Sequence, residues 1–235
     1  MNFSIRSYQQ ELLDAEHIPY NDLAQNLREL DVINRLLGGH AITIKGISSL
    51  TKNLNQPITI LDLGSGGGDT LRAIARWARK VNKKLNLIGV DLKPECIDFA
   101  RKESADFPEI SFIQSDYRAI DASQLQPDII ISSLFCHHLQ QQQIVELLQW
   151  MNENGKMGFV INDLHRHPLA YHSIHLLTML FSKSYLVKND AKLSVARGFK
   201  LSEWKELLKK AGISNANISW EWAFRHLITV RTHGF

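Results

Sequence analysis

Cysteine is scarce in this chain of 235 residues. Only Cys96 and Cys136 occur, and their separation fits neither a zinc-binding motif nor the disulfide framework of a small secreted protein. The sequence therefore predicts a reducing compartment, the cytoplasm.

Long apolar runs and a strong charge of one sign are also missing. No stretch approaches the roughly 18 uninterrupted apolar residues of a transmembrane helix, so no integral membrane segment is expected. The formal net charge is +3, which gives no reason to expect a nucleic-acid partner. The opening stretch MNFSIRSYQQELLDAEH is polar and acidic, and it has no basic-then-apolar signal pattern.

Helical periodicity dominates the N-terminal part of the chain. A stripe of leucines predicts a helix over 22–37, which Gly38 ends, and a second helix is expected over 41–53. Pro57 then begins a different pattern. We therefore predict a helical N-terminal cap over 1–55 and a second domain over 56–235.

Short apolar runs alternate with helical patterns along most of this second domain. The expected strands are 58–63, 85–91, 110–116, 128–134 and 156–163, and the expected helices between them are 69–82, 95–104 and 140–151. Such alternation predicts a parallel sheet with helices on both faces. A helix over 201–212 and two further runs predict an antiparallel strand pair at the end of the sheet.

The segment ITILDLGSGGGDT, residues 58–70, places a glycine-rich loop directly after the first expected strand. A nucleoside-triphosphate loop would need a lysine that is missing here, and Asp69 stands where a dinucleotide loop needs its third glycine. A carboxylate at that position would repel pyrophosphate. The pattern suits a ligand that needs close backbone approach and carries positive charge, such as S-adenosylmethionine.

Acidic residues follow the next expected strands in turn. Asp91 ends the second strand and is placed to bind ribose hydroxyls, while Asp116 ends the third and could accept from the adenine amino group. Leu92 and Tyr117, one position further along, could pack against the base.

These stretches resemble the class I S-adenosylmethionine-dependent methyltransferases. The matching motifs are ILDLGSGGGDT, VDLK, SDYRAI and ISSLFCHHL, and the resemblance covers residues 57–235. It implies a Rossmann-like, seven-stranded, mostly parallel sheet with an antiparallel C-terminal strand pair, and S-adenosyl-L-methionine as cofactor. The cofactor residues that it implies, beyond the four just named, are Asp62, Gly64, Ser65, Gly66, Gly68 and Ser133.

Histidines gather where an acceptor should approach. His137 and His138 follow the fourth strand, and His165 follows the fifth together with Asp163, so that a carboxylate–histidine pair is possible. We predict His137, His165 and Asp163 as catalytic, because a phenol acceptor must lose a proton. No spacing among the histidines is a recognised metal-ligand motif, and no metal is predicted.

The segment over about 164–200 is longer than a simple crossover needs, and its first half is apolar on nearly every side of a helix. Such a helix should be buried, either as core or as a lid over a pocket for a lipophilic acceptor. Met179, Phe181 and Tyr185 are candidate wall residues. A resemblance to the quinone- and polyketide-tailoring methyltransferases also implies a small aromatic or lipophilic acceptor, methylated on oxygen, with methylation on carbon as the alternative.

Two other functions stay open at this point. A nicotinamide-dependent oxidoreductase would use the same sheet, although Asp69 argues against it. A non-catalytic module that binds the cofactor and contacts a partner would carry the same motifs without the chemistry.

Overall fold

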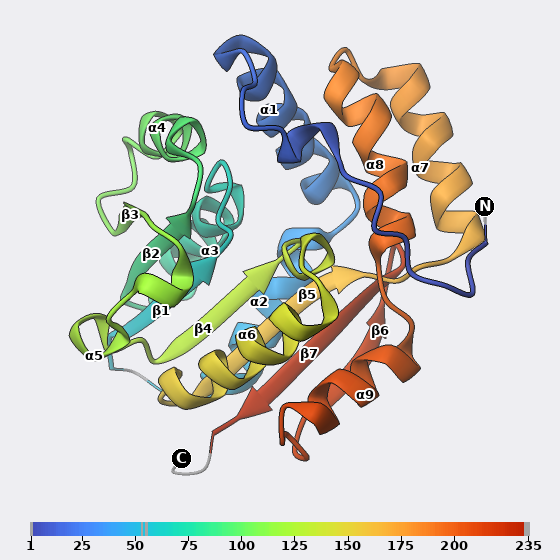
Figure 1. The fold of residues 1–235 in the computed structure, drawn as a ribbon. Coiled ribbons are helices and arrows are strands. Elements are labelled where there is room, and N and C mark those ends of the chain that lie inside the picture. The colour runs from blue at the N-terminus through green and yellow to red at the C-terminus, as the bar shows by residue number, and fades with distance from the viewer. Residues whose placement is uncertain (1, 53, 55, 233–235) are drawn as a thin grey trace.

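A single mixed sheet organises the chain in the computed structural model, which describes residues 2–52, 54 and 56–232 (Figure 1). Its seven strands lie in the order β3-β2-β1-β4-β5-β7-β6. The strand bounds are β1 Ile58–Leu63, β2 Leu85–Asp91, β3 Ile110–Gln114, β4 Ile129–Ser133, β5 Gly158–Leu164, β6 Asn217–Glu221 and β7 Arg225–Arg231. The first five strands are parallel, and β7 runs antiparallel to both β5 and β6.

Helices cover both faces of this sheet, as the alternation in the sequence predicts. The helix bounds are α1 Tyr20–Leu36, α2 Gly39–Leu50, α3 Asp69–Lys80, α4 Pro94–Glu103, α5 Ala122–Leu125, α6 Gln141–Asn154, α7 Pro168–Phe181, α8 Tyr185–Arg197 and α9 Leu201–Lys210. Helices α2, α3 and α4 pack with one face of the sheet, while α6 and α9 pack with the other.

The two faces of β1 show how the core is divided. Ile60 packs in the cluster that contains α2 and α3, whereas its neighbour Leu61 packs in the cluster that contains α6 and α9. Both side chains are fully buried, since successive strand residues point to opposite faces and both faces are covered. The predicted α/β fold with its final antiparallel pair is confirmed.

The N-terminal helices sit close to their predicted positions. Helix α1 begins directly after Pro19, and Gly38, with φ of 74°, separates it from α2. Helix α2 lies against the sheet rather than away from it, because a Cβ added at Gly46 would meet Val160 of β5 at 2.5 Å. Residues 53 and 55, where the predicted second helix and the predicted cap end, lie outside the described residues.

The long segment after β5 forms two helices instead of one buried helix. Ser184 caps α8 by accepting from the Val187 N–H, and Glu29 of α1 accepts from the N–H groups of Lys183 and Ser184. The expectation that the apolar part is buried is wrong. Ala170 and Thr178 are the buried residues of α7, and Phe181 is 78% exposed. None of the described helices is both long enough and apolar enough to cross a bilayer.

His226, on β7, is buried beside His165, with ring centroids 4.8 Å apart. Burial, and next the charge of His165, lower the pKa of His226 to about 4, below its ordinary value of 6.5. The unfolded chain therefore binds a proton that the folded chain excludes, and stability falls as the pH drops from 6.5 toward 4.

Replacing His226 by leucine should remove this loss. Between pH 8 and pH 5, the free energy of unfolding should fall by about 1–2 kcal/mol more in the unchanged protein than in His226→Leu. Urea denaturation at both pH values measures it, with the exposed His17→Leu as a control. An equal pH dependence in all three proteins would show that His226 titrates normally.

Candidate active site

The glycine loop follows β1 at the carboxyl edge of the sheet, and its backbone conformation explains its composition. Gly64 and Gly66 have φ of 72° and 50°, in the left-handed region that glycine adopts without strain. A Cβ added at Gly64 would lie 2.4 Å from the ring of Phe135. Position 64 therefore has room only for glycine between β1 and the segment that follows β4.

Asp91 closes this loop from the end of β2. Its Oδ2 accepts from the Gly66 N–H (2.8 Å) and its Oδ1 from the Lys93 N–H (3.0 Å). Each carboxylate oxygen keeps a free lone pair for a ligand hydroxyl. Burial raises the pKa of Asp91, while the two N–H groups oppose that shift.

Asp62 is buried at the end of β1, with its Oδ1 unpartnered among the described residues. Burial, with the nearby charges of Asp69 and Asp91, raises the pKa of its carboxyl well above the usual range. A cationic ligand would relieve this repulsion, because opposite charges attract strongly in a region poor in water. The loop therefore fits a ligand with an ammonium or sulfonium group, and S-adenosylmethionine carries both.

A cavity of about 790 Å³ opens over the loop and extends between α1, α7 and α8. Seven of the residues predicted to hold the cofactor line it: Asp62, Gly64, Ser65, Gly66, Asp91, Leu92 and Ser133. Gly68 lies next to wall residues Gly67 and Asp69 and caps the N-terminus of α3.

Asp116 and Tyr117 lie outside the cavity wall. The Asp116 carboxylate pairs with Arg118, which donates to both of its oxygens, and the Tyr117 ring packs edge-on against Trp150 at 5.7 Å. The structure thus brings Asp91 to the loop and turns Asp116 toward another partner. A role for Asp116 and Tyr117 in adenine recognition stays a prediction from the sequence.

The carboxylate–histidine pair exists, but its histidine is His137. His137 Nδ1 donates to Asp163 Oδ1 (2.8 Å), and the backbone N–H of His137 donates to Asp163 Oδ2 (3.2 Å). The pKa of Asp163 is lowered despite complete burial, because the charge and hydrogen bond of His137 favour the ionised form. This carboxylate fixes the ring and directs Nε2 away from Asp163.

His165 lies elsewhere. Its Nδ1 accepts from Trp220 Nε1 (3.1 Å), and its backbone N–H donates to Phe224. The His165 ring lies beside those of His167 and His226, with centroids 5.8 and 4.8 Å away. A pair of His165 with Asp163 is therefore not formed.

The acceptor side of the cavity is mostly apolar. Ile174 and Leu177 of α7 line it, whereas the predicted wall residues Met179, Phe181 and Tyr185 are more than half exposed, at 53%, 78% and 53%. None of these three residues lines the cavity. The prediction that Met179, Phe181 and Tyr185 form the wall of the pocket is therefore wrong.

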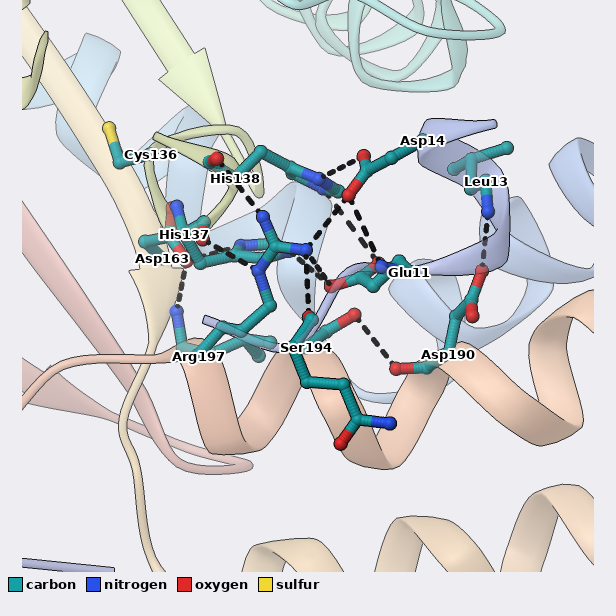
Figure 2. Close-up of polar contacts among 12 residues, drawn as sticks. Glu11, Leu13, Asp14, Cys136, His137, His138, Asp163, Asp190, Ser194 and Arg197 are labelled. Carbon is teal, nitrogen blue, oxygen red and sulfur yellow. Dashed lines mark hydrogen bonds and ion pairs between the residues drawn. The ribbon is translucent and has the colours of Figure 1, made fainter. Parts of the chain in front are cut away.

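Three charged residues near the cavity were not predicted from the sequence. Glu11 and Asp14 come from the segment before α1 and reach the histidines after β4 (Figure 2). No periodicity or motif marks this segment, so the sequence offers no signal for it. Arg225 is a third: its Nη2 donates to Asn34 Oδ1 (3.0 Å), and burial lowers its pKa to about 10.

Comparison with known families decides the class of protein. Residues 60–158 match the family model described as a methyltransferase domain. This part of the chain is a methyltransferase domain. The match begins in β1 and ends at β5, so it contains the glycine loop, Asp91 and His137.

Solved structures agree with the fold of this methyltransferase. The plantazolicin methyltransferase BpumL in complex with SAH is 17% identical, with a TM-score of 0.64 over 91% of this chain and 95% of that one. Human N-acetylserotonin methyltransferase in complex with SAM is 18% identical, with a TM-score of 0.62 over 92% and 57%. No curated protein matches the sequence. Both of these similar structures hold the methyl donor or its product, SAM or SAH.

Removing the Asp91 carboxylate tests the cofactor site. Asp91→Ala should weaken binding of S-adenosylhomocysteine by about 1–3 kcal/mol, through loss of hydrogen bonds to a charged acceptor. Isothermal titration calorimetry measures it. Asp98→Ala, an exposed carboxylate on α4, is the matched control. Equal affinity in both variants would mean that the ligand does not reach Asp91.

Proposed function

We propose that the methyltransferase transfers a methyl group to a hydroxyl oxygen of a small aromatic or lipophilic acceptor. One observation carries the proposal: a histidine held by a buried carboxylate lines the same cavity as the glycine loop, and the rest of that cavity is mostly apolar. A lipophilic acceptor fits the apolar part, and a hydroxyl group needs the histidine.

The cofactor side is assigned to residues at the carboxyl ends of β1 and β2. Asp62 faces the positive charge, the backbone of Gly64 and Gly66 gives close approach, and Asp91 binds the ribose hydroxyls. When bound there, S-adenosylmethionine supplies the methyl group: the acceptor oxygen forms a bond to the methyl carbon as the carbon–sulfur bond breaks, leaving S-adenosylhomocysteine.

The acceptor side is assigned to the segments that flank the sheet domain. Residues 1–55 act as a cap and residues 164–200 as a lid, and both contribute wall residues such as Leu27, Ile33 and Ile174. Two of the similar structures support a small aromatic acceptor, since these methyltransferases are named for N-acetylserotonin and for magnesium protoporphyrin IX. The magnesium protoporphyrin IX methyltransferase, from Synechocystis PCC 6803, is 11% identical, with a TM-score of 0.57 over 84% of each chain.

His137 promotes the loss of the acceptor proton. Its Nδ1 is held by Asp163, so the ring presents Nε2 as the free nitrogen. Asp163 is fully buried and stabilises positive charge on the ring. Water is excluded by the apolar wall, which strengthens these interactions.

His137→Asn should lower turnover about 10²–10⁴-fold and leave S-adenosylhomocysteine affinity unchanged, since general acid–base groups contribute that much. Formation of S-adenosylhomocysteine with a panel of phenols and hydroxylated quinones measures turnover, and His165→Asn is the control that should stay active. Cofactor binding by the unchanged protein without turnover on any acceptor would contradict the proposal, as would equal loss in both variants.

The acceptor wall can be tested on a single helix. Ile174→Ala should raise KM for bulky acceptors several-fold, because it removes apolar contact in the cavity. Met179→Ala, on the exposed side of α7, should leave KM unchanged. Steady-state kinetics with the best acceptor of the panel separates the two outcomes. A higher KM in the Met179 variant alone would reverse the assignment of the helix faces.

A further inference from the structure

Three side chains that could bind a metal ion converge on the cavity wall. His137 and His138 lie on the short 3-10 turn Cys136–His138 after β4, and Glu11 reaches them from the N-terminal segment (Figure 2). One ligand atom from each residue lies within 4.8 Å of the other two. All three residues line the cavity.

Both imidazoles are oriented so that the same nitrogen is available. His137 Nδ1 bonds to Asp163 and His138 Nδ1 bonds to Asp14, each at 2.8 Å. The free Nε2 atoms both face the Glu11 carboxylate, at 3.8 Å from Oε1 and 3.9 Å from Oε2. A carboxylate on the far nitrogen of a ligating histidine is the usual support of a metal site, because it fixes the tautomer and raises the basicity of the ligand.

Glu11 lacks the partner that a buried carboxylate requires. Its side chain is 3% exposed, and its Oε1 accepts no hydrogen bond from the described residues. The nearest cation, Arg197, stays 3.8 Å from this oxygen, so the water that it has lost is only partly replaced.

The separations suit one small ion. Bonds of about 2.0–2.2 Å from zinc to nitrogen or oxygen put two tetrahedral ligand atoms roughly 3.3–3.6 Å apart. The two Nε2–carboxylate distances of 3.8 and 3.9 Å exceed this by a few tenths of an ångström, so small side-chain movements would bring the ligands to one ion. Two imidazoles with one carboxylate are a ligand set of catalytic zinc and of other divalent transition metals, which leaves further positions open.

The charges around the three ligands also admit a cation. Glu11, Asp14 and Asp163 supply three carboxylates, against the guanidinium groups of Arg197 and Arg6. Arg197 is already bonded to Asp14 Oδ2 (2.8 Å) and to three backbone carbonyls, and it stays 3.8 Å from Glu11 Oε1. Arg6 donates to the carbonyls of the same turn and of Arg197.

We propose that Glu11, His137 and His138 bind a divalent transition-metal ion, for which zinc is the probe. The three residues can bind an ion whether or not the proposed methyl transfer is correct. The role of the ion in the reaction rests on the proposed function: an ion with open positions toward the cavity would bind the acceptor hydroxyl and lower the pKa of that hydroxyl. His137 then acts as a ligand of the ion, the acceptor proton passes to solvent, and Asp163 and Asp14 are positioning residues.

The test is a zinc titration of protein freed of metal with a chelator. Isothermal titration calorimetry should show one zinc ion per chain, and elemental analysis after desalting should give the same ratio. Glu11→Gln and His138→Asn should each weaken zinc binding at least about tenfold, and Asp14→Asn should weaken it about 10–100-fold. Glu16→Gln and His17→Asn, exposed residues of the same segment, should bind zinc like the unchanged protein.

A second titration keeps the two proposals apart. S-adenosylhomocysteine is titrated into every metal-free protein, which also shows that each variant is folded. Zinc binding that is absent, or equal in the Glu11→Gln and unchanged proteins, overturns the metal site even if the cofactor binds, and leaves His137 as a direct base. Zinc binding that depends on Glu11 and His138 supports the site even if no acceptor is turned over.

Discussion

Carboxylates crowd the carboxyl edge of the parallel sheet, and the site is built around compensating their charge. Parallel strands end at one edge, so Asp62, Asp91 and Asp163 meet there, with Asp62 and Asp163 buried and Asp91 half-buried. Each carboxylate is compensated differently. Asp163 is paired with His137, Asp91 accepts two backbone N–H groups, and Asp62 has an oxygen without any partner in the described chain. The unpaired charge is the one that calls for a cationic cofactor.

The sheet and the glycine loop could be predicted from the sequence because their signals are local. Strand β1 was expected at 58–63 and lies at Ile58–Leu63, since buried strands show as continuous apolar runs and glycines mark the turn. The partner of Asp163 could not be predicted in this way. His165 is nearer in sequence, but β5 extends one residue past Asp163, and His137 approaches from the neighbouring strand.

The rest of the candidate site depends on contacts between distant segments. Glu11 lies in a stretch without periodicity, and its place follows from two carboxylate hydrogen bonds that Asp190 of α8 accepts from Leu12 and Leu13. Helix α7 misled the sequence analysis for a different reason. Its apolar residues surround the helix, so periodicity could not tell which of them face the cavity, and Phe181, at the end of the helix, is exposed outside the cavity wall.

The bonds from Asp190 also join two walls of the cavity. Leu12 and Leu13 donate to Asp190 at 2.8 and 2.9 Å, so the segment that carries Glu11 is held against α8. The place of Glu11 beside both imidazoles therefore depends on where α8 lies. A substitution of Asp190 would act on the three proposed ligands from a distance, without replacing any of them.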